Sequence, residues 1–177
     1  MALVRSPAHQ EAASSSCRSG CSYDVFLSFR GEDTRKNFTD HLYTAFVDAG
    51  LFTFRDDEEL KRGEDIKVEL PRAIQQSRTS VIVLSKGYAS SRWCLDELVM
   101  ILERKRRTCP GQDHRHVVLP VFYDVDPSQL RKQTGSLAKA FAWHQKNESL
   151  NKVNRWREAL QEVADLAGMV LKNQADG

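Results

Sequence analysis

The chain has 177 residues, of which 41% are hydrophobic, and a formal net charge of +2. This length allows one domain with a substantial hydrophobic core, and the small charge gives no reason to expect binding to nucleic acid or to an anionic membrane. No stretch reaches the roughly 18 apolar residues that a membrane span needs, and the N-terminus does not have the apolar core of a secretory signal.

Cysteine and histidine spacing argues against a metal site or a disulfide framework. The four cysteines are Cys17, Cys21, Cys94 and Cys109. No two of them form a C-x-x-C pair, so we predict neither zinc nor disulfides, and a reducing, intracellular compartment fits best. His114 and His116 stand without a third ligand, so we expect both histidines to be exposed to solvent and predict no metal.

The first third of the chain predicts a tail, then a strand, a helix and a second strand. Residues 1–22 are rich in Ser, Ala and charge, so we expect a disordered tail. We predict a strand at 23–29, a turn at 30–34 and a strand at 51–54. The helix between them is indicated by an apolar stripe that ends at Gly50 and comprises Phe38, Leu42, Ala45, Phe46 and Ala49.

A charged loop separates this part from the middle of the chain. In residues 55–65 only Leu60 and Gly63 carry no charge, so composition alone favours a solvated loop. A helix should follow at 66–77, with a late start or a kink because of Pro71. We then predict a strand at 79–84, a helix at 92–107 and a polar loop at 108–116.

The remaining residues predict one more clear strand and three helical segments. The strand covers 117–123, a helix starts near Pro127, and 136–145 is helical. The last helix has an apolar stripe from Val153 to Ala167 and should end at Gly168. A fifth strand lies in or near 146–153 or 169–171. Strands that alternate with helices predict an α/β fold with a doubly wound parallel sheet and helices on both faces.

The residues after the third strand suggest a ligand site. Cys94, Leu98 and Ile101 recur at helical spacing and predict a buried stripe. Trp93 and Glu97 lie four residues apart on an adjacent face, within two turns of the helix start. We therefore expect a partly exposed carboxylate beside an aromatic ring, at the sheet edge where open α/β folds bind ligands.

Four segments together resemble the Toll/interleukin receptor/resistance-protein (TIR) domain, most closely its plant branch. They are Tyr23–Thr34, Arg55–Asp65, Trp93–Leu98 and Val121–Pro127. The resemblance implies a flavodoxin-like sheet of strand order 2-1-3-4-5 and a TIR domain over 23–171. Residues 172–177 would then begin a linker to further domains of a longer immune receptor, with a free-standing TIR protein as the alternative.

In family terms the resemblance implies an enzyme that cleaves the nicotinamide–ribose bond of NAD⁺ and of NADP⁺. Products would be nicotinamide with ADP-ribose or a variant cyclic ADP-ribose, in plant immune and cell-death signalling. The family's catalytic glutamate matches Glu97, NAD⁺ is the substrate, and no cofactor is needed. Arg30 is a reasonable phosphate partner and Trp93 a flat face for a ring. The expected binding residues are Phe29, Arg30, Gly31, Glu32, Asp33, Thr34, Gly63 and Trp93.

The resemblance also implies activation by self-association with other TIR domains. His41 corresponds to a residue of one family interface and Gly168 to a glycine near a second. The loop 55–65, which contains Gly63, would move when domains stack. The implied location is the cytoplasm, with the nucleus as an alternative.

Three other functions occur on similar α/β folds and make different demands on the sequence. A non-catalytic oligomerisation module shares the fold, so only the pairing of Glu97 with Trp93 favours catalysis. A phosphoacceptor receiver would need an aspartate where Ser85 stands and an acidic pair where Phe29 and Arg30 stand. A dinucleotide-dependent dehydrogenase would need G-x-G-x-x-G after a strand, and the sequence does not contain it.

Overall fold

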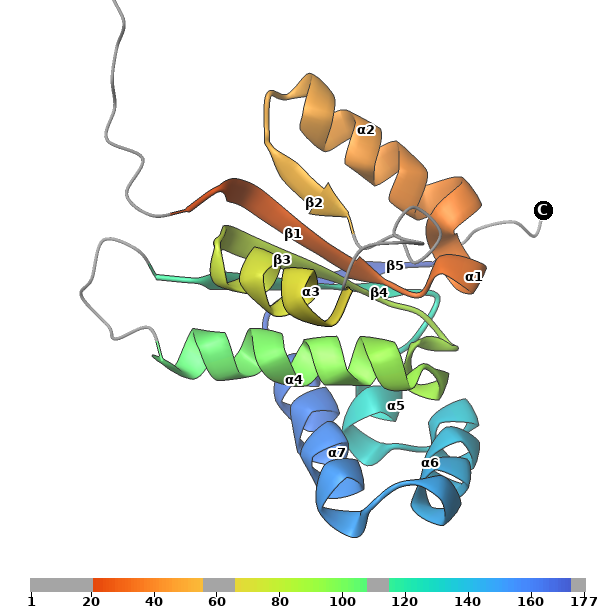
Figure 1. Cartoon of the computed structure of the whole chain (residues 1–177). Helices are drawn as coiled ribbons and strands as arrows, with labels where there is room; N and C mark the ends of the chain where they lie inside the picture. Colours follow the sequence, from red (N-terminus) through yellow and green to blue (C-terminus); the bar gives the residue numbers. More distant parts are fainter. Residues whose placement is uncertain (1–20, 56–65, 108–114, 173–177) are drawn as a thin grey trace, which may run out of the picture.

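The computed structural model describes residues 21–55, 66–107 and 115–172 and contains five parallel strands (Figure 1). The strands are β1 (Tyr23–Phe29), β2 (Thr53–Arg55), β3 (Ser77–Leu84), β4 (Val117–Tyr123) and β5 (Met169–Leu171). Their order in the sheet is β2-β1-β3-β4-β5, with every neighbouring pair parallel. The predicted fold class and strand order are confirmed.

Helical segments connect these strands. After β1 come α1 (Gly31–Thr34), η1 (Arg35–Thr39) and α2 (Asp40–Asp48), and α3 (Ile66–Gln75) precedes β3. The short turn η2 (Tyr88–Ser90) and α4 (Arg92–Arg107) follow β3. The connection from β4 to β5 consists of α5 (Pro127–Lys132), α6 (Ser136–Asn147) and α7 (Leu150–Ala164). Among the described residues, no helix is long and apolar enough to cross a membrane.

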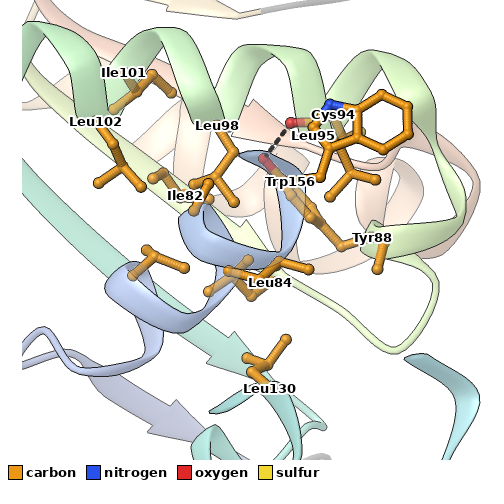
Figure 2. Packing of buried hydrophobic residues seen from close by; sticks show 14 of the residues in the cluster. Ile82, Leu84, Tyr88, Cys94, Leu95, Leu98, Ile101, Leu102, Leu130 and Trp156 are labelled. Atoms are coloured by element: carbon orange, nitrogen blue, oxygen red, sulfur yellow. Dashed lines mark hydrogen bonds between the residues drawn. The ribbon is translucent and has the colours of Figure 1, made fainter. Parts of the chain in front are cut away.

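The sheet separates two hydrophobic clusters. Alternate residues of β1 face opposite sides, so Phe26 packs with α3 and α4 while Leu27 packs toward α2. In Figure 1, α2 lies on one face of the sheet, and α3, α4 and α7 lie on the other. The larger cluster is on the α4 side. Figure 2 shows its centre, where residues of β3 and α4 meet Trp156 of α7.

Several element boundaries differ from the sequence prediction. The predicted turn at 30–34 is largely helical, because α1 begins at Gly31 directly after β1. Strand β3 begins two residues earlier than predicted, at Ser77, whose side chain is buried and donates a hydrogen bond to the carbonyl of Ala73 (2.7 Å). Helix α3 contains Pro71 without ending there. The helical stripe predicted after β1 is partly wrong, because Ala45 and Ala49 are exposed.

The C-terminal elements correct two further predictions. The fifth strand is at Met169–Leu171, and the alternative at 146–153 is wrong because that segment is mostly helical. Helix α7 ends at Ala164, so Gly168 is not its stop signal. A Cβ at Gly168 would collide with the backbone carbonyl of Pro120 in β4. Glycine at this position therefore permits the close approach that starts the β4–β5 pairing.

His116 is buried, contrary to the prediction of a solvent-exposed histidine. Its ring is 1% exposed, with Nε2 3.0 Å from the Ser80 hydroxyl and Nδ1 3.1 Å from the carbonyl oxygen of Ser77. Burial, with the nearby positive charge of Arg104, lowers the pKa of His116 from 6.5 to about 4. The neighbouring His114 lies outside the described residues.

The shifted pKa of His116 predicts loss of stability in mild acid. Below its ordinary pKa of 6.5 the unfolded chain binds a proton that the folded chain does not bind until about pH 4. The free energy of unfolding should therefore decrease as the pH falls from 6.5 to about 4, by up to about 3 kcal/mol from this residue. Urea unfolding across this range should be less pH-dependent in His116→Asn than in the exposed control His41→Asn. Equal slopes in the two variants would contradict the assignment.

Candidate functional site

A pocket of about 750 Å³ opens at the carboxyl ends of β1 and β3. The strand order places these two strands side by side, and the chain leaves them in opposite directions along the sheet. Open α/β sheets bind ligands in the crevice that forms at such a point. The pocket has the volume of a small-molecule site. Six predicted binding residues line it: Phe29, Arg30, Gly31, Glu32, Asp33 and Trp93. These residues lie up to sixty-odd positions apart in the sequence, and the fold brings them together.

Asp33 joins the two loops that form the pocket. Its Oδ2 accepts hydrogen bonds from the Ser85 hydroxyl (2.5 Å) and from the backbone N–H of Gly87 (3.0 Å), both after β3. Its Oδ1 accepts a hydrogen bond from Nη1 of Arg30 (2.7 Å). A Cβ at Gly87 would collide with Arg30 and Asp33. Both oxygens of Asp33 are therefore engaged in holding the pocket walls and Arg30 in place.

Asp33 should accordingly contribute more to stability than its neighbour Glu32. Asp33→Ala removes the acceptor for three donors that are partly buried, and we expect a loss of about 1–3 kcal/mol in the free energy of unfolding. Glu32→Ala is the matched control, because Glu32 also bonds Arg30 but its side chain is 80% exposed, and such ion pairs contribute about 0–1 kcal/mol. Urea unfolding measures both. Equal losses would contradict the role of Asp33 as a link between the loops.

Glu97 is fully buried, and the prediction of a partly exposed carboxylate is wrong. It is 0% exposed and is not among the residues that line the pocket. Its Oε2 lies 2.7 Å from the hydroxyl of Ser28 on β1. The reason is visible in the spacing, since Cys94, Glu97, Leu98 and Ile101 all lie on the buried stripe of α4. Cys94, one turn before Glu97, does line the pocket, so Glu97 lies one helical turn from a lining residue.

Trp93 and Cys94 hold the start of α4 against the end of β1. Trp93, at the second position of α4, is half-buried and lines the pocket. The Cys94 thiol lies 3.6 Å from the carbonyl of Phe29 and donates to it. Ser91 caps the helix by accepting a hydrogen bond from the backbone N–H of Cys94 (3.2 Å). A ring and a buried carboxyl group are thus fixed at one end of the same helix.

Two of the expected binding residues are not found in the pocket. Thr34 is 1% exposed, and its hydroxyl accepts a hydrogen bond from Thr39 (2.7 Å) inside the helical connection after β1. Gly63 lies outside the described residues, as does the whole segment 56–65. Of the two expected interface residues, His41 is exposed on α2 and Gly168 is exposed before β5.

The sequence reading missed the pocket residues Arg35, Lys36 and Asn37. Because α1 begins at Gly31, Arg35 lies one turn further on and its guanidinium packs over that glycine, where a Cβ would collide with it. A helix start placed at Gly31 would have predicted Arg35 on the same face. Together with Arg30, these residues give the pocket three positive side chains, against the two carboxylates Glu32 and Asp33.

A parallel sheet of order 2-1-3-4-5 with a polar pocket at its switch point defines the chain as a flavodoxin-like α/β domain. Within that class the chain belongs to the TIR domain family, whose family model matches residues 22–177.

Its relatives include plant disease-resistance proteins. The chain is 58% identical over 152 residues to the disease resistance protein RUN1 of Vitis rotundifolia, with 85% of this chain and 11% of RUN1 covered. It is 51% identical over 158 residues to the TMV resistance protein N of Nicotiana glutinosa, with 88% and 13% covered. The chain thus spans only about a tenth of the length of these relatives.

A solved structure has the same fold. It is that of the TIR domains in the activated Roq1 resistosome directly recognizing the pathogen effector XopQ. It superposes with a TM-score of 0.76 at 53% sequence identity, covering 88% of this chain and 92% of that one.

Proposed function

We propose that this TIR domain cleaves the nicotinamide–ribose bond of NAD⁺, and of NADP⁺, with Glu97 as the catalytic residue. The observation that carries the proposal is the position of Glu97 one turn beyond Trp93 and Cys94, which line a pocket large enough for a nucleotide. The products are nicotinamide and ADP-ribose or a variant cyclic ADP-ribose.

The chemistry needs one carboxylate and no general acid. Loss of nicotinamide leaves positive, oxocarbenium-like charge on the ribose, and a nearby carboxylate stabilises that charge. The pyridinium departs as neutral nicotinamide, so no proton has to be supplied to it. Bond cleavage therefore needs only the Glu97 carboxylate, once it reaches the pocket. Water then adds to the ribosyl cation and loses a proton to give ADP-ribose, or a nucleophilic atom of the substrate itself adds and gives the cyclic product.

The other pocket residues suit a dinucleotide. Trp93 offers a half-buried ring on which nicotinamide or adenine can stack. Arg30 is held by Asp33, and its second carboxylate partner, Glu32, is exposed and can be exchanged for a substrate phosphate. Gly31 brings backbone close to the bound phosphates.

A non-catalytic oligomerisation module is the second candidate, and the burial of Glu97 favours it. A carboxylate that never reaches the pocket could not act on NAD⁺, and the domain would then signal by assembly alone. Chromatographic measurement of nicotinamide release from NAD⁺ separates the two candidates. Nicotinamide release by the wild-type chain supports the enzymatic function. A chain that self-associates but releases no nicotinamide at any protein concentration supports the non-catalytic module.

We expect activity to depend on self-association through the α2 surface. His41 is exposed on α2 and is not among the residues that line the pocket. If association of domains brings the Glu97 carboxylate into the pocket, nicotinamide release per mole of chain should rise with protein concentration, because assembly follows mass action. His41→Ala should lower this rise several-fold, and light scattering on the same samples should show less assembly. A specific activity that stays constant on dilution and is equal in both proteins would mean that each monomer is a complete enzyme.

A further inference from the structure

Glu97 belongs to a buried polar cluster formed with Ser28 of β1 and Tyr88 of η2. The Ser28 hydroxyl lies 2.7 Å from Oε2 of Glu97 and 2.9 Å from the Tyr88 hydroxyl. The Tyr88 hydroxyl in turn donates to the carbonyl oxygen of Cys94 at 3.0 Å, the bond drawn as a dashed line in Figure 2. All three side chains are 0% exposed.

The hydrogens available to these contacts can be counted. Three contacts link four oxygens in a row, from Glu97 through Ser28 and Tyr88 to the Cys94 carbonyl. Each contact needs one hydrogen, while Ser28 and Tyr88 carry one each and the carbonyl carries none. If Glu97 is ionised, two hydrogens must serve three contacts, and two oxygens face each other at close range with only lone pairs between them. Such an arrangement is costly in a buried, low-dielectric environment.

A protonated Glu97 satisfies all three contacts in a single direction. An ionised Glu97 would accept the Ser28 hydrogen at the 2.7 Å contact. In the protonated state this direction is reversed: the acid O–H donates to Ser28, Ser28 is free to donate to Tyr88, and Tyr88 donates to the carbonyl of Cys94. Chains of hydrogen bonds that run in one direction strengthen one another. Burial also disfavours the charged form of a carboxyl group. The hydrogen count and the burial therefore favour the same protonation state.

We infer that Ser28 and Tyr88 are positioning residues that hold Glu97 as a neutral, buried carboxylic acid one helical turn from the pocket, in a resting arrangement. The inference rests on the proposed function for the catalytic role of Glu97 and adds how that residue is regulated. A neutral acid cannot stabilise an oxocarbenium ion as a carboxylate does. Turnover therefore requires the carboxyl group to leave Ser28, release its proton to water and reach the pocket.

Infrared difference spectroscopy on the whole chain, without NAD⁺, tests the protonation directly. The spectrum of the wild type minus that of Glu97→Gln should contain the carbonyl stretch of a protonated carboxylic acid, and this band should shift in D₂O. The Gln amide can donate to Ser28 as the acid does, so this variant should keep the wild-type midpoint of urea unfolding. Loss of carboxylate bands in place of the acid band would overturn the inference.

A second comparison does not depend on the folding of the Glu97 variant. Tyr88→Phe removes the middle acceptor of the chain, so the acid band of the otherwise unchanged protein should move or disappear. Tyr43→Phe is the matched control, because Tyr43 packs on the opposite face of the sheet, beside Arg55, and it should leave the band where it is. An acid band that responds equally to both substitutions, or to neither, would show that Tyr88 does not position Glu97.

The spectra, together with nicotinamide release by the same variants, distinguish failure of this inference from failure of the proposed function. If Glu97→Gln releases nicotinamide as fast as the wild type, the catalytic assignment fails, whatever the acid band shows. If the band is missing while Glu97→Gln is inactive, the enzyme stands and the neutral resting state is wrong.

Discussion

Glu97→Gln is expected to reduce nicotinamide release from NAD⁺ by at least about 10²–10³-fold, the loss typical when a group that stabilises transition-state charge is removed. The amide has the shape of the carboxyl group but cannot carry the negative charge that balances the ribosyl cation. Initial rates of nicotinamide release at equal protein concentration measure the effect. Glu103→Gln, two turns further along α4 and paired with Arg155 on the surface, is the control and should keep the wild-type rate.

The choice of glutamine over alanine follows from the structure. An exposed Glu97 could be replaced by alanine with little effect on stability, but the residue is 0% exposed and bonded to Ser28. Glu97→Ala would remove the buried contact of Glu97 with the Ser28 hydroxyl, at a cost of about 1–3 kcal/mol, and would also leave a cavity. A folded Glu97→Gln protein with near-normal activity would contradict the catalytic assignment, whereas inactivity of an unfolded alanine variant would say nothing about catalysis.

Trp156→Ala is expected to lower the free energy of unfolding by about 3–5 kcal/mol, the largest stability effect that we predict for a single substitution. Trp156 is 1% exposed at the centre of the larger cluster (Figure 2). Its indole N–H donates to Asp96 of α4 (2.9 Å), and its ring contacts His144 of α6 edge to face. The side chain thus joins three helices, and its removal leaves a cavity that they cannot all close.

Two other tryptophan variants provide controls for Trp156→Ala, with urea unfolding followed by circular dichroism. Trp143 on α6 is 51% exposed, so Trp143→Ala should change the free energy of unfolding by only about 0.5 kcal/mol. Trp156→Phe keeps an apolar ring and loses the bond to Asp96, so its loss should be intermediate. If Trp143→Ala is as damaging as Trp156→Ala, burial of Trp156 does not explain its effect.

The order of strands and helices could be predicted from the sequence, because buried strands appear as short apolar runs and helices as apolar residues spaced three or four apart. Residues 117–123 and 92–107 were predicted with the bounds that β4 and α4 have in the structure. Boundaries failed where tertiary contacts decide them. The sequence alone indicates that Ser77 is the polar end of a helix, but Ser77 pairs with Tyr23 of β1 and begins β3. It likewise indicates that Gly168 stops a helix, but this glycine lies against Pro120 of β4.

The location of the pocket could be predicted from the sequence, but the burial of Glu97 could not. The strand order alone places the loop after β1 beside the segment after β3, and Arg30 and Trp93 do meet there. Whether Glu97 faces the pocket or the core depends on how α4 is rotated about its axis. The buried partner of Glu97 is Ser28 of β1, a residue 69 positions earlier in the sequence. The double use of Asp33 by Ser85 and Gly87 likewise depends on a contact across more than fifty residues.

The measurement that tests the central claim most directly is nicotinamide release from NAD⁺ by the wild type and by folded Glu97→Gln, across one range of protein concentrations. Light scattering on the same samples records assembly. We expect release by the wild type to rise as the protein assembles, and release by Glu97→Gln to stay at least about 10²–10³-fold lower at every concentration. An assembled wild-type protein that releases no nicotinamide, or equal release by the two proteins, would contradict this claim.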